Sequence, residues 1–414
     1  MPYWRLQPYR VDTKTTFMKR ILLFLAASGC LYANAQVGIG TANPQTGFHV
    51  VDSAVAFTKT GDVEASTVAP ISGAGRRLMW YPEKAAFRVG YVGSFGSTYW
   101  DAGTVGNYSF AAGNNTRASG ANSVALGLAT TASGSESVAL GNNGTASRDR
   151  AFAFNGTASG VGAVAIGSGA QATQDDALAM GPSSIAGGLA SIVLGPSIAN
   201  GSFGVAIGLQ NSASGNFSTA IGKNARTANR QGAMVLSCGG AGFSSDSSFA
   251  TANNQMTMRF IGGFKLFTTY QKIASPMGVE LAPGGGSWTS VSDRNKKENF
   301  QEIDVETVLQ KVAMIPVTRW NYKSQPADQQ HIGPVAQDFH AAFQLDGTKN
   351  DTTINTVDID GINMAAIQAL EKRTAALKAE NDQLKAQLAA LLERMTALEQ
   401  RTADAAKTTP ISTE

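Results

Sequence analysis

Apolar and small polar positions alternate in short blocks that recur along the middle of the chain. The clearest block reads Ser-Val-Ala-Leu-Gly, at Ser123–Gly127 and again at Ser137–Gly141. Similar blocks return every 12 to 15 residues. A near-constant period of this kind predicts a solenoid in which each repeat forms one coil. The blocks end at positions 113, 127, 141, 155, 167, 181, 195, 208, 222 and 237.

Each block has the two-residue period of a β-strand. Val124 and Leu126 share one face, Ser123 and Ala125 share the other, and Gly127 ends the strand. A second turn signal, Thr-Ala-Ser-Gly, separates several blocks, so one repeat corresponds to strand, turn, short strand and turn. We expect the larger aliphatic side chains to fill the narrow interior, and the small residues to allow close approach between coils or chains. A flexible linker is the alternative, but linkers do not keep an aliphatic alternation in register.

About ten of these repeats, from Tyr108 to Leu236, resemble the head repeats of YadA-like trimeric autotransporter adhesins, which carry the same five-residue element. The resemblance implies a mainly β fold, a trimeric left-handed parallel β-roll in which three chains associate side by side. The expected partner is therefore the chain itself, as a homotrimer. Those adhesins end in a membrane anchor, whereas this chain ends in a helical pattern and a polar tail.

The N-terminal segment has the pattern of an export signal. A basic and then apolar run, Met18–Cys30, precedes a small-residue cleavage site that ends at Ala35. We expect residues 1–35 to be a signal peptide with an upstream extension, cut between Ala35 and Gln36; lipidation at Cys30 is the alternative. No segment is apolar enough for a permanent membrane span. We therefore expect an exported protein without a transmembrane anchor, either extracellular or associated with the cell surface or outer membrane.

Charge and cysteine content disfavour several functions. The chain has 33 basic and 30 acidic residues, and the segment 104–240 holds only six basic and four acidic ones, so nucleic-acid binding is not expected. With two cysteines, Cys30 and Cys238, and three scattered histidines, we expect no disulfide framework, no metal and no cofactor. Asp175 and Asp176 would face opposite ways on a strand, which disfavours a glycan-hydrolase site in the repeats.

One segment, Ser290–Phe300, has residues suited to catalysis, because Ser292 is followed five residues later by Lys297. On its own such a pair is more typical of a helix cap or a solvated turn. The surroundings strengthen the pattern. A glycine-rich stretch precedes the pair, and three motifs follow it in order: an apolar helical pattern, the sequence Pro-Val-Thr-Arg-Trp-Asn-Tyr, and the sequence His-Ile-Gly-Pro-Val-Ala-Gln-Asp.

This series resembles the C-terminal intramolecular chaperone of phage endosialidases and other tailspikes, a family that cleaves its own chain with a Ser-Lys dyad. The resemblance runs from Ser292 to Leu391 and implies that Ser292 is the nucleophile of a single-turnover serine peptidase and Lys297 its base. Neighbouring Lys296 remains a competitor, and the scissile bond lies on either side of Ser292. Six further matching positions are interpreted as structural or assembly residues: Asp293, Arg294, His331, Gly333, Gln337 and Asp338.

Leucines recur every seven residues near the C-terminus, which predicts a coiled coil of about five heptads. Asn381 at an a position, with leucine at d, favours a parallel dimer. Both resemblances imply a trimer instead, which we expect because the β-roll and chaperone interfaces are larger. The predicted core residues are Ile367, Leu370, Leu377, Asn381, Leu384, Leu388, Leu391, Met395 and Leu398.

Together the patterns predict an exported homotrimeric surface fibre or adhesin-like protein whose chaperone aligns three chains and then cleaves itself off next to Ser292. A phage-like tail fibre of the same architecture, and a fibre whose chaperone does not cleave, are the alternatives. The ligand of the head, a glycan or a protein, is left open. The expected parts are a signal region (1–35), a β-rich segment (36–104), the β-roll (105–240), a β-rich connector (241–289), a small α+β chaperone domain (290–391) with a coiled coil (362–402), and a disordered tail (403–414).

Overall fold

The computed structural model describes residues 1–5, 13–14, 17–18, 20, 36–65, 67–240, 246–269, 277–345 and 352–407. These residues form two compact units, Met1–Phe260 and Ile261–Glu414, each of which is described by itself. Most of the predicted signal region, including Cys30 and Ala35, lies outside the described residues, as does the end of the tail. Gln36 is described and exposed, and it directly precedes the first strand.

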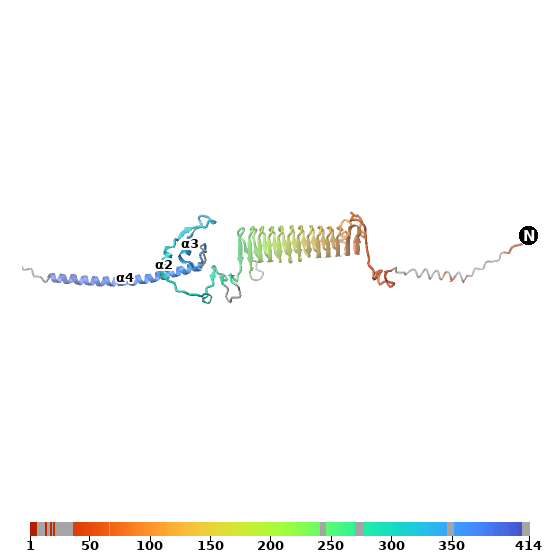
Figure 1. Ribbon diagram of the computed structural model, residues 1–414. Helices are drawn as coiled ribbons and strands as arrows, with labels where there is room; N and C mark the ends of the chain where they lie inside the picture. The colour runs from red at the N-terminus through yellow and green to blue at the C-terminus, as the bar shows by residue number, and fades with distance from the viewer. Residues whose placement is uncertain are drawn as a thin grey trace, which may run out of the picture. The chain divides into compact units, whose positions relative to one another are not determined.

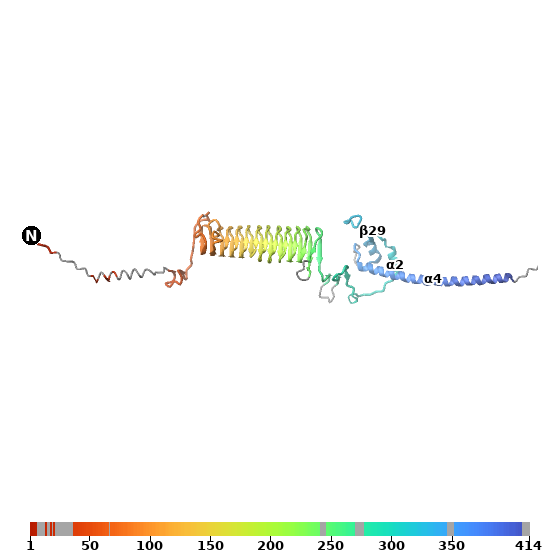
Figure 2. The same cartoon turned by 180° about the vertical axis from the view of Figure 1, so that it is seen from behind.

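A β-solenoid dominates the first unit and appears in Figures 1 and 2 as a stack of regular coils. Its strands form one 13-stranded and one 10-stranded sheet, and nearly all neighbours pair in parallel. The predicted solenoid is therefore confirmed. The larger sheet runs through β3 (Gly75–Tyr81), β4 (Ala86–Val92), β5 (Phe110–Asn114), β7 (Val124–Leu128), β9 (Val138–Asn142), β11 (Phe152–Phe154), β13 (Val164–Ile166), β15 (Leu178–Met180), β17 (Ile192–Leu194), β19 (Val205–Leu209), β21 (Thr219–Lys223), β23 (Met234–Ser237) and β25 (Met256–Arg259).

The smaller sheet takes one two-residue strand from each coil. Its strands are β6 (Arg117–Ala118), β8 (Thr131–Ala132), β10 (Thr145–Ala146), β12 (Thr157–Ala158), β14 (Gln171–Ala172), β16 (Ile185–Ala186), β18 (Ile198–Ala199), β20 (Ser212–Ala213), β22 (Ala225–Arg226) and β24 (Ser248–Phe249). Ahead of the solenoid, β1 (Val37–Ile39) and β2 (Phe48–Val50) form a separate parallel pair, and the 3₁₀-helix η2 (Pro82–Lys84) joins β3 to β4.

Alanine, and not the larger aliphatic residues, fills the interior of the solenoid, so the expectation about the interior was wrong. Ala125 and Ala139 are in register on neighbouring strands and are fully buried, and Ala132 and Ala146 oppose them from the smaller sheet. Ser123, also on the inner face, is fully buried and donates to the carbonyl oxygen of Gly120 at 2.6 Å. Valine replaces alanine at Val193 and Val235, which are also fully buried, and the strand alternation directs the other large aliphatic side chains outward.

Glycine lies at or next to the end of most strands of the larger sheet, where neighbouring coils approach closely. Gly127 has φ +121°, and a Cβ on it would lie only 2.0 Å from the carbonyl oxygen of Gly141 on the next coil. A residue with a side chain would therefore be excluded by both its backbone conformation and the adjacent coil.

Two aliphatic columns run along the outer face of the larger sheet, one on each side of the inward alanine position. Most of their members are half-buried or exposed in the single chain. The first column contains Val124, Val138, Phe152, Val164, Leu178, Ile192 and Val205. The second contains Leu126, Leu140, Phe154, Ile166, Met180, Leu194, Ile207, Ile221 and Leu236.

A buried arginine occupies the interior at the N-terminal end of the solenoid. Arg88 on β4 is in register with Ala111 and has no exposed surface. Its guanidinium donates to the carbonyl oxygens of Phe87, Ser109 and Ala118 at 2.8–2.9 Å and to the Ser109 hydroxyl at 2.7 Å. Burial lowers the pKa of Arg88 to about 10, so it remains a cation at neutral pH. Nearby Trp100 is fully buried.

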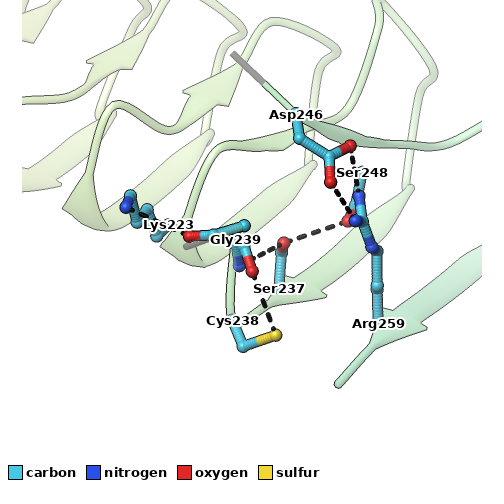
Figure 3. A network of polar contacts seen from close by, with 8 residues as sticks. Lys223, Ser237, Cys238, Gly239, Asp246, Ser248 and Arg259 are labelled. Carbon is cyan, nitrogen blue, oxygen red and sulfur yellow. Dashed lines mark hydrogen bonds and ion pairs between the residues drawn. The ribbon is translucent and has the colours of Figure 1, made fainter. Parts of the chain in front are cut away.

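A polar network marks the other end of the solenoid (Figure 3). The buried hydroxyls of Ser237 on β23 and Ser248 on β24 lie 3.0 Å apart, which joins the two sheets. Arg259 on β25 binds both carboxylate oxygens of Asp246, and its hydrogen bonds lower the pKa of that carboxyl. Cys238 is exposed there, and its thiol donates to the carbonyl oxygen of Gly239 at 3.3 Å.

The second unit begins with a small antiparallel sheet of β26 (Phe264–Phe267), β27 (Gly278–Leu281) and β28 (Thr289–Ser290). The remaining elements are η3 (Arg294–Lys296), α2 (Val305–Met314), the antiparallel pair β29 (Thr318–Trp320) and β30 (His331–Gly333), α3 (Ala336–Phe343) and the long helix α4 (Thr356–Lys407). The first turns of α4 pack against α2, with Ile362, Ala365, Ala366 and Ala369 buried.

Replacing an interior alanine should destabilise the solenoid more than shortening an outer aliphatic residue. Ala139→Leu forces three more carbons into a filled interior, at a cost of about 1–3 kcal/mol. Leu140→Ala, the adjacent outward position, should alter the thermal unfolding of separated chains much less. Circular dichroism melting of both variants checks this, and an equal or larger loss for Leu140→Ala would contradict the assignment of the faces.

Candidate functional site

The structure brings the predicted nucleophile and base together. Lys297 Nζ donates to Ser292 Oγ at 2.7 Å. Ser292 lies between β28 and η3, and Lys297 caps the end of η3 with an extended backbone. The contact joins the two residues that the resemblance assigns as a dyad, and Lys297, rather than Lys296, makes it.

The local chain explains how residues five positions apart meet. The Asp293 carboxylate accepts from the Asn295 backbone N–H at 2.9 Å, which caps a single 3₁₀ turn. The Lys297 N–H then closes this turn by donating to the Arg294 carbonyl oxygen at 3.2 Å. Arg294 also stacks over the ring of Phe300, 5.1 Å from its centroid. Asp293 and Arg294 therefore shape the turn that returns the lysine to the serine.

Ser292 and Lys297 are both exposed in the single chain. A lysine with ordinary surroundings is protonated at neutral pH, and a protonated amine can donate to a serine hydroxyl but cannot take its proton. A general base here needs an uncharged amine, which apolar surroundings or neighbouring positive charge favour. The single chain therefore has the dyad geometry without the burial that would activate it.

The backbone just before the dyad is held by the small sheet. Val279 pairs with Ser290, and Glu280 pairs with Thr289. The Val291 N–H donates to the Gly278 carbonyl oxygen at 3.3 Å. Ser292 is therefore the first residue beyond this set of hydrogen bonds.

His331 and Gly333 lie in a separate cluster on the β29–β30 pair. The His331 ring packs against Trp320 and Tyr322, with centroids 4.9 and 5.5 Å away, and its Nε2 lies 2.9 Å from Gln325 Oε1. Trp320 Nε1 donates to the Gly333 carbonyl oxygen at 3.3 Å. These contacts hold the strand pair together, and the structural role of His331 and Gly333 stays a prediction. The sequence did not indicate that Gln325 would complete the cluster.

Gln337 and Asp338 lie on the first turn of α3 and face two shallow cavities. Gln337 lines one together with Trp320 and Tyr322, and Asp338 lines the other together with Lys311 and Met314 of α2. Neither cavity includes Ser292 or Lys297. The structure therefore places these two residues among the packing elements of the domain and apart from the dyad.

Most of the predicted coiled-coil residues lie along α4 on the C-terminal side of the buried residues Ile362 to Ala369. The apolar members of this set are all exposed in the single chain, with Ile367 and Leu377 near 65%. Ile362 and Ala369, by contrast, are buried against the domain. The helix therefore has two apolar stripes, one used within the chain and one exposed.

Two family comparisons match this chain. The family model of the YadA head domain repeat, which spans two copies, matches residues 105–130, 132–154, 158–184, 172–197 and 199–225. The family model for the chaperone of endosialidase matches residues 292–347. The chain joins YadA-type head repeats to a segment similar to the endosialidase chaperone. Both resemblances are thus confirmed, although the second match ends before Leu391. No curated protein matches the chain.

Neither a membrane-spanning helix nor a metal-binding cluster is present in the described part of the chain. None of its helices combines the length and the apolar character that a membrane span requires. Among the residues that the structure describes, no group of three or more His, Cys, Asp and Glu side chains is placed to hold a metal ion. YadA-type head repeats indicate a surface or exported protein.

An ionic contact between α2 and α4 was not predicted. Asp304 caps α2 by accepting from the Glu306 N–H at 3.1 Å and from the Thr307 hydroxyl at 2.5 Å. Glu306 binds the guanidinium of Arg373 on α4, with Nε 3.2 Å from Oε2, and this contact lowers the pKa of Glu306. The Asp-x-x-Thr spacing indicates the cap, but the partner of Glu306 is 67 residues away.

The Glu306–Arg373 contact should make the α2–α4 packing sensitive to acid. A carboxyl with a lowered pKa contributes stability above its unfolded value, here 4.5, and that contribution is lost as the pH falls through the folded value. The melting temperature of the wild type should therefore exceed that of Glu306→Gln near neutral pH, and this difference should disappear below pH 4.5. Glu302→Gln, an exposed position before α2, is the control. A difference in melting temperature that stays constant through this pH range would contradict the prediction.

Proposed function

We propose that this protein is an exported homotrimeric surface fibre, adhesin-like in its head, whose C-terminal chaperone aligns the chains and then cleaves itself off. The observation that carries the proposal is the 2.7 Å contact between Lys297 Nζ and Ser292 Oγ. It occurs at the first residue of the segment similar to the endosialidase chaperone, immediately after the fibre's last hydrogen-bonded strand.

Trimerisation is supported by apolar surfaces that a single chain cannot cover. The outer columns of the solenoid present a long aliphatic strip, and the exposed stripe of α4 repeats every seven residues. Surfaces of this extent are typical of protein–protein contacts. Copies of the same chain would bury both in one assembly, with the columns packed around the axis of the head and the leucines around the axis of a coiled coil.

The chemistry within one chain favours the Val291–Ser292 bond. Attack of Ser292 Oγ on the carbonyl carbon of Val291 closes a five-membered ring, whereas attack on its own carbonyl carbon would close a strained four-membered ring. Lys297 takes the hydroxyl proton, and the peptide nitrogen of Ser292 leaves as an amine after receiving a proton. The resulting ester joins the Val291 carbonyl to Ser292 Oγ. Water then hydrolyses it, which leaves a carboxylate on Val291 and a free N-terminus at Ser292.

Exposure of the dyad in the single chain explains why cleavage would wait for assembly. Neighbouring copies would remove Lys297 from water, and desolvation favours the neutral amine that the reaction needs. The solenoid depends on in-register pairing along its whole length, which forms slowly and exposes strands meanwhile. A cut made only after assembly would leave the fibre kinetically trapped in its folded form.

Export rests on the signal pattern that ends at Ala35 and on the head repeats. The head ligand, a glycan or a protein, has no site assigned to it. A phage-like tail fibre would share the architecture, and a fibre that keeps its chaperone would share the fold without the reaction.

Cleavage should depend on the dyad. Mature chain beginning at Gln36 should yield a C-terminal fragment starting at Ser292, seen on a denaturing gel and by intact mass. Ser292→Ala should abolish this fragment, and Lys297→Ala should slow its formation by about 10²–10⁴-fold. Lys296→Ala is the matched control and should cleave like wild type.

Two results would change the interpretation. A fragment beginning at Asp293 would move the scissile bond to the other side of the serine. Intact wild-type chain in a properly assembled trimer would show that the domain folds and holds the fibre without cutting it.

The outer columns should be required for the trimer. Leu140→Glu places three like charges at the proposed interface, so sedimentation should show dissociated chains whose circular dichroism still reports the solenoid. Thr145→Glu, which faces outward on the smaller sheet, should remain trimeric. A trimer of unchanged stability in Leu140→Glu would place the interface elsewhere.

A further inference from the structure

The sheet formed by β26, β27 and β28, here called the neck sheet, has no role in the proposed cleavage. It lies directly before Ser292 in the sequence. Its three strands are short, and their antiparallel register pairs Phe264 with Leu281 and Leu266 with Val279. Paired residues of an antiparallel sheet point to the same side, so the register defines two distinct faces.

One face of the neck sheet is apolar. Strand alternation places Phe264 and Leu266 together on it, and their partners Leu281 and Val279 join them. Trp288, just before β28, contacts Phe264 with ring centroids 6.4 Å apart, so it belongs to the same face.

The opposite face is mostly polar. Lys265 Nζ lies 3.2 Å from Glu280 Oε1, and Thr289 Oγ1 donates to the Glu280 carbonyl oxygen at 3.0 Å. Phe267 also projects to this side, because it is one residue after Leu266. Water and the Lys265–Glu280 ion pair satisfy the polar groups of this face, so it does not need to pack against another surface.

Part of the apolar face is exposed in the single chain. Leu266 is 53% exposed and Trp288 is 52% exposed, despite the contact between Trp288 and Phe264. A sheet of three short strands gains its stability from an apolar face packed against something else. An exposed face of this kind therefore marks an interaction surface.

We propose that the apolar face of the neck sheet packs against the same face of its copies and locks the chains together after the chaperone has left. The proposal rests on the proposed function, because the copies are those of the homotrimer. In sequence, the neck sheet lies between the outer columns of the solenoid and the leucine stripe of α4, two apolar surfaces that the proposed homotrimer would bury. Its apolar face carries no charge, and identical copies can pack there without opposing like charges.

The position of the scissile bond supports a role after cleavage. The last backbone hydrogen bond of the sheet runs from Val291 N–H to the Gly278 carbonyl oxygen, at 3.3 Å. A cut between Val291 and Ser292 leaves every strand of the neck sheet on the head fragment. The coiled coil of α4 departs with the chaperone, so the neck sheet becomes the last contact between chains at the new C-terminus.

The test compares neighbouring positions on the two faces. Leu266→Asp puts a charge on the apolar face, and Phe267→Asp puts the same group on the polar face. Both are made in the full mature chain, with and without Ser292→Ala, and hydrogen exchange of the β26–β28 amides is measured by mass spectrometry. In the cleaved trimer, Leu266→Asp should lose at least about tenfold of the amide protection, because a buried leucine contact is removed. Phe267→Asp should keep wild-type protection.

The uncleaved variants separate this proposal from the previous one. In the Ser292→Ala background the coiled coil still holds the chains, so Leu266→Asp should lose less protection than it does after cleavage. Equal protection of Leu266→Asp and Phe267→Asp would overturn the neck-sheet interface, even if cleavage at Ser292 occurs normally. Intact wild-type chain would overturn the cleavage proposal, while a loss of protection confined to Leu266→Asp would still identify the interface.

Discussion

The narrow interior of the solenoid accepts little more than alanine and serine, and most of the molecule's surface chemistry follows from this limit. Alanine at most inward positions, replaced by valine at Val193 and Val235, brings the two sheets together, and glycine at or near most strand ends lets one coil contact the next through its backbone. Most larger side chains are therefore excluded from the interior. They line up on the outer face of the larger sheet, where strand pairing holds them in two continuous columns. A solenoid built on alanine therefore places its aliphatic side chains where another chain can reach them.

The same limit explains what could and could not be predicted from the sequence. The period of the Ser-Val-Ala-Leu-Gly blocks predicted the coil, its strands and its turns. It also predicted that Val124 and Leu126 share a face, but not which face is interior. Hydrophobicity favoured placing leucine inside, whereas the width of the coil, a property of the stacked structure, directs it outward. The alternation alone could not have shown which face of the strand is interior, because either face would give the same two-residue period.

In the second unit, contacts within a short segment could be expected from the sequence, whereas contacts between distant segments could not. The resemblance to the endosialidase chaperone implied that Ser292 and Lys297 form a pair, and the turn capped by Asp293 explains how residues five positions apart come into contact. The Glu306–Arg373 contact and the ring cluster around His331 depend on residues brought together by packing, and their spacing in sequence gives no signal of it. The motifs identified the matching positions of the chaperone segment, but the structure was needed to separate those that shape the dyad from those that hold the strand pair.

Arg88 makes the interior at the N-terminal end of the solenoid different from the alanine-lined interior that follows it. At this end a guanidinium, bonded to the carbonyl oxygens around it, occupies the space where a further alanine would stand. Beyond Arg88, β3 pairs antiparallel with β4 and forms the edge of the larger sheet at this end, so a second solenoid that docked head to tail would meet β3 and not a parallel coil. End-to-end polymerisation into filaments, the usual hazard of stacked parallel strands, is thereby disfavoured.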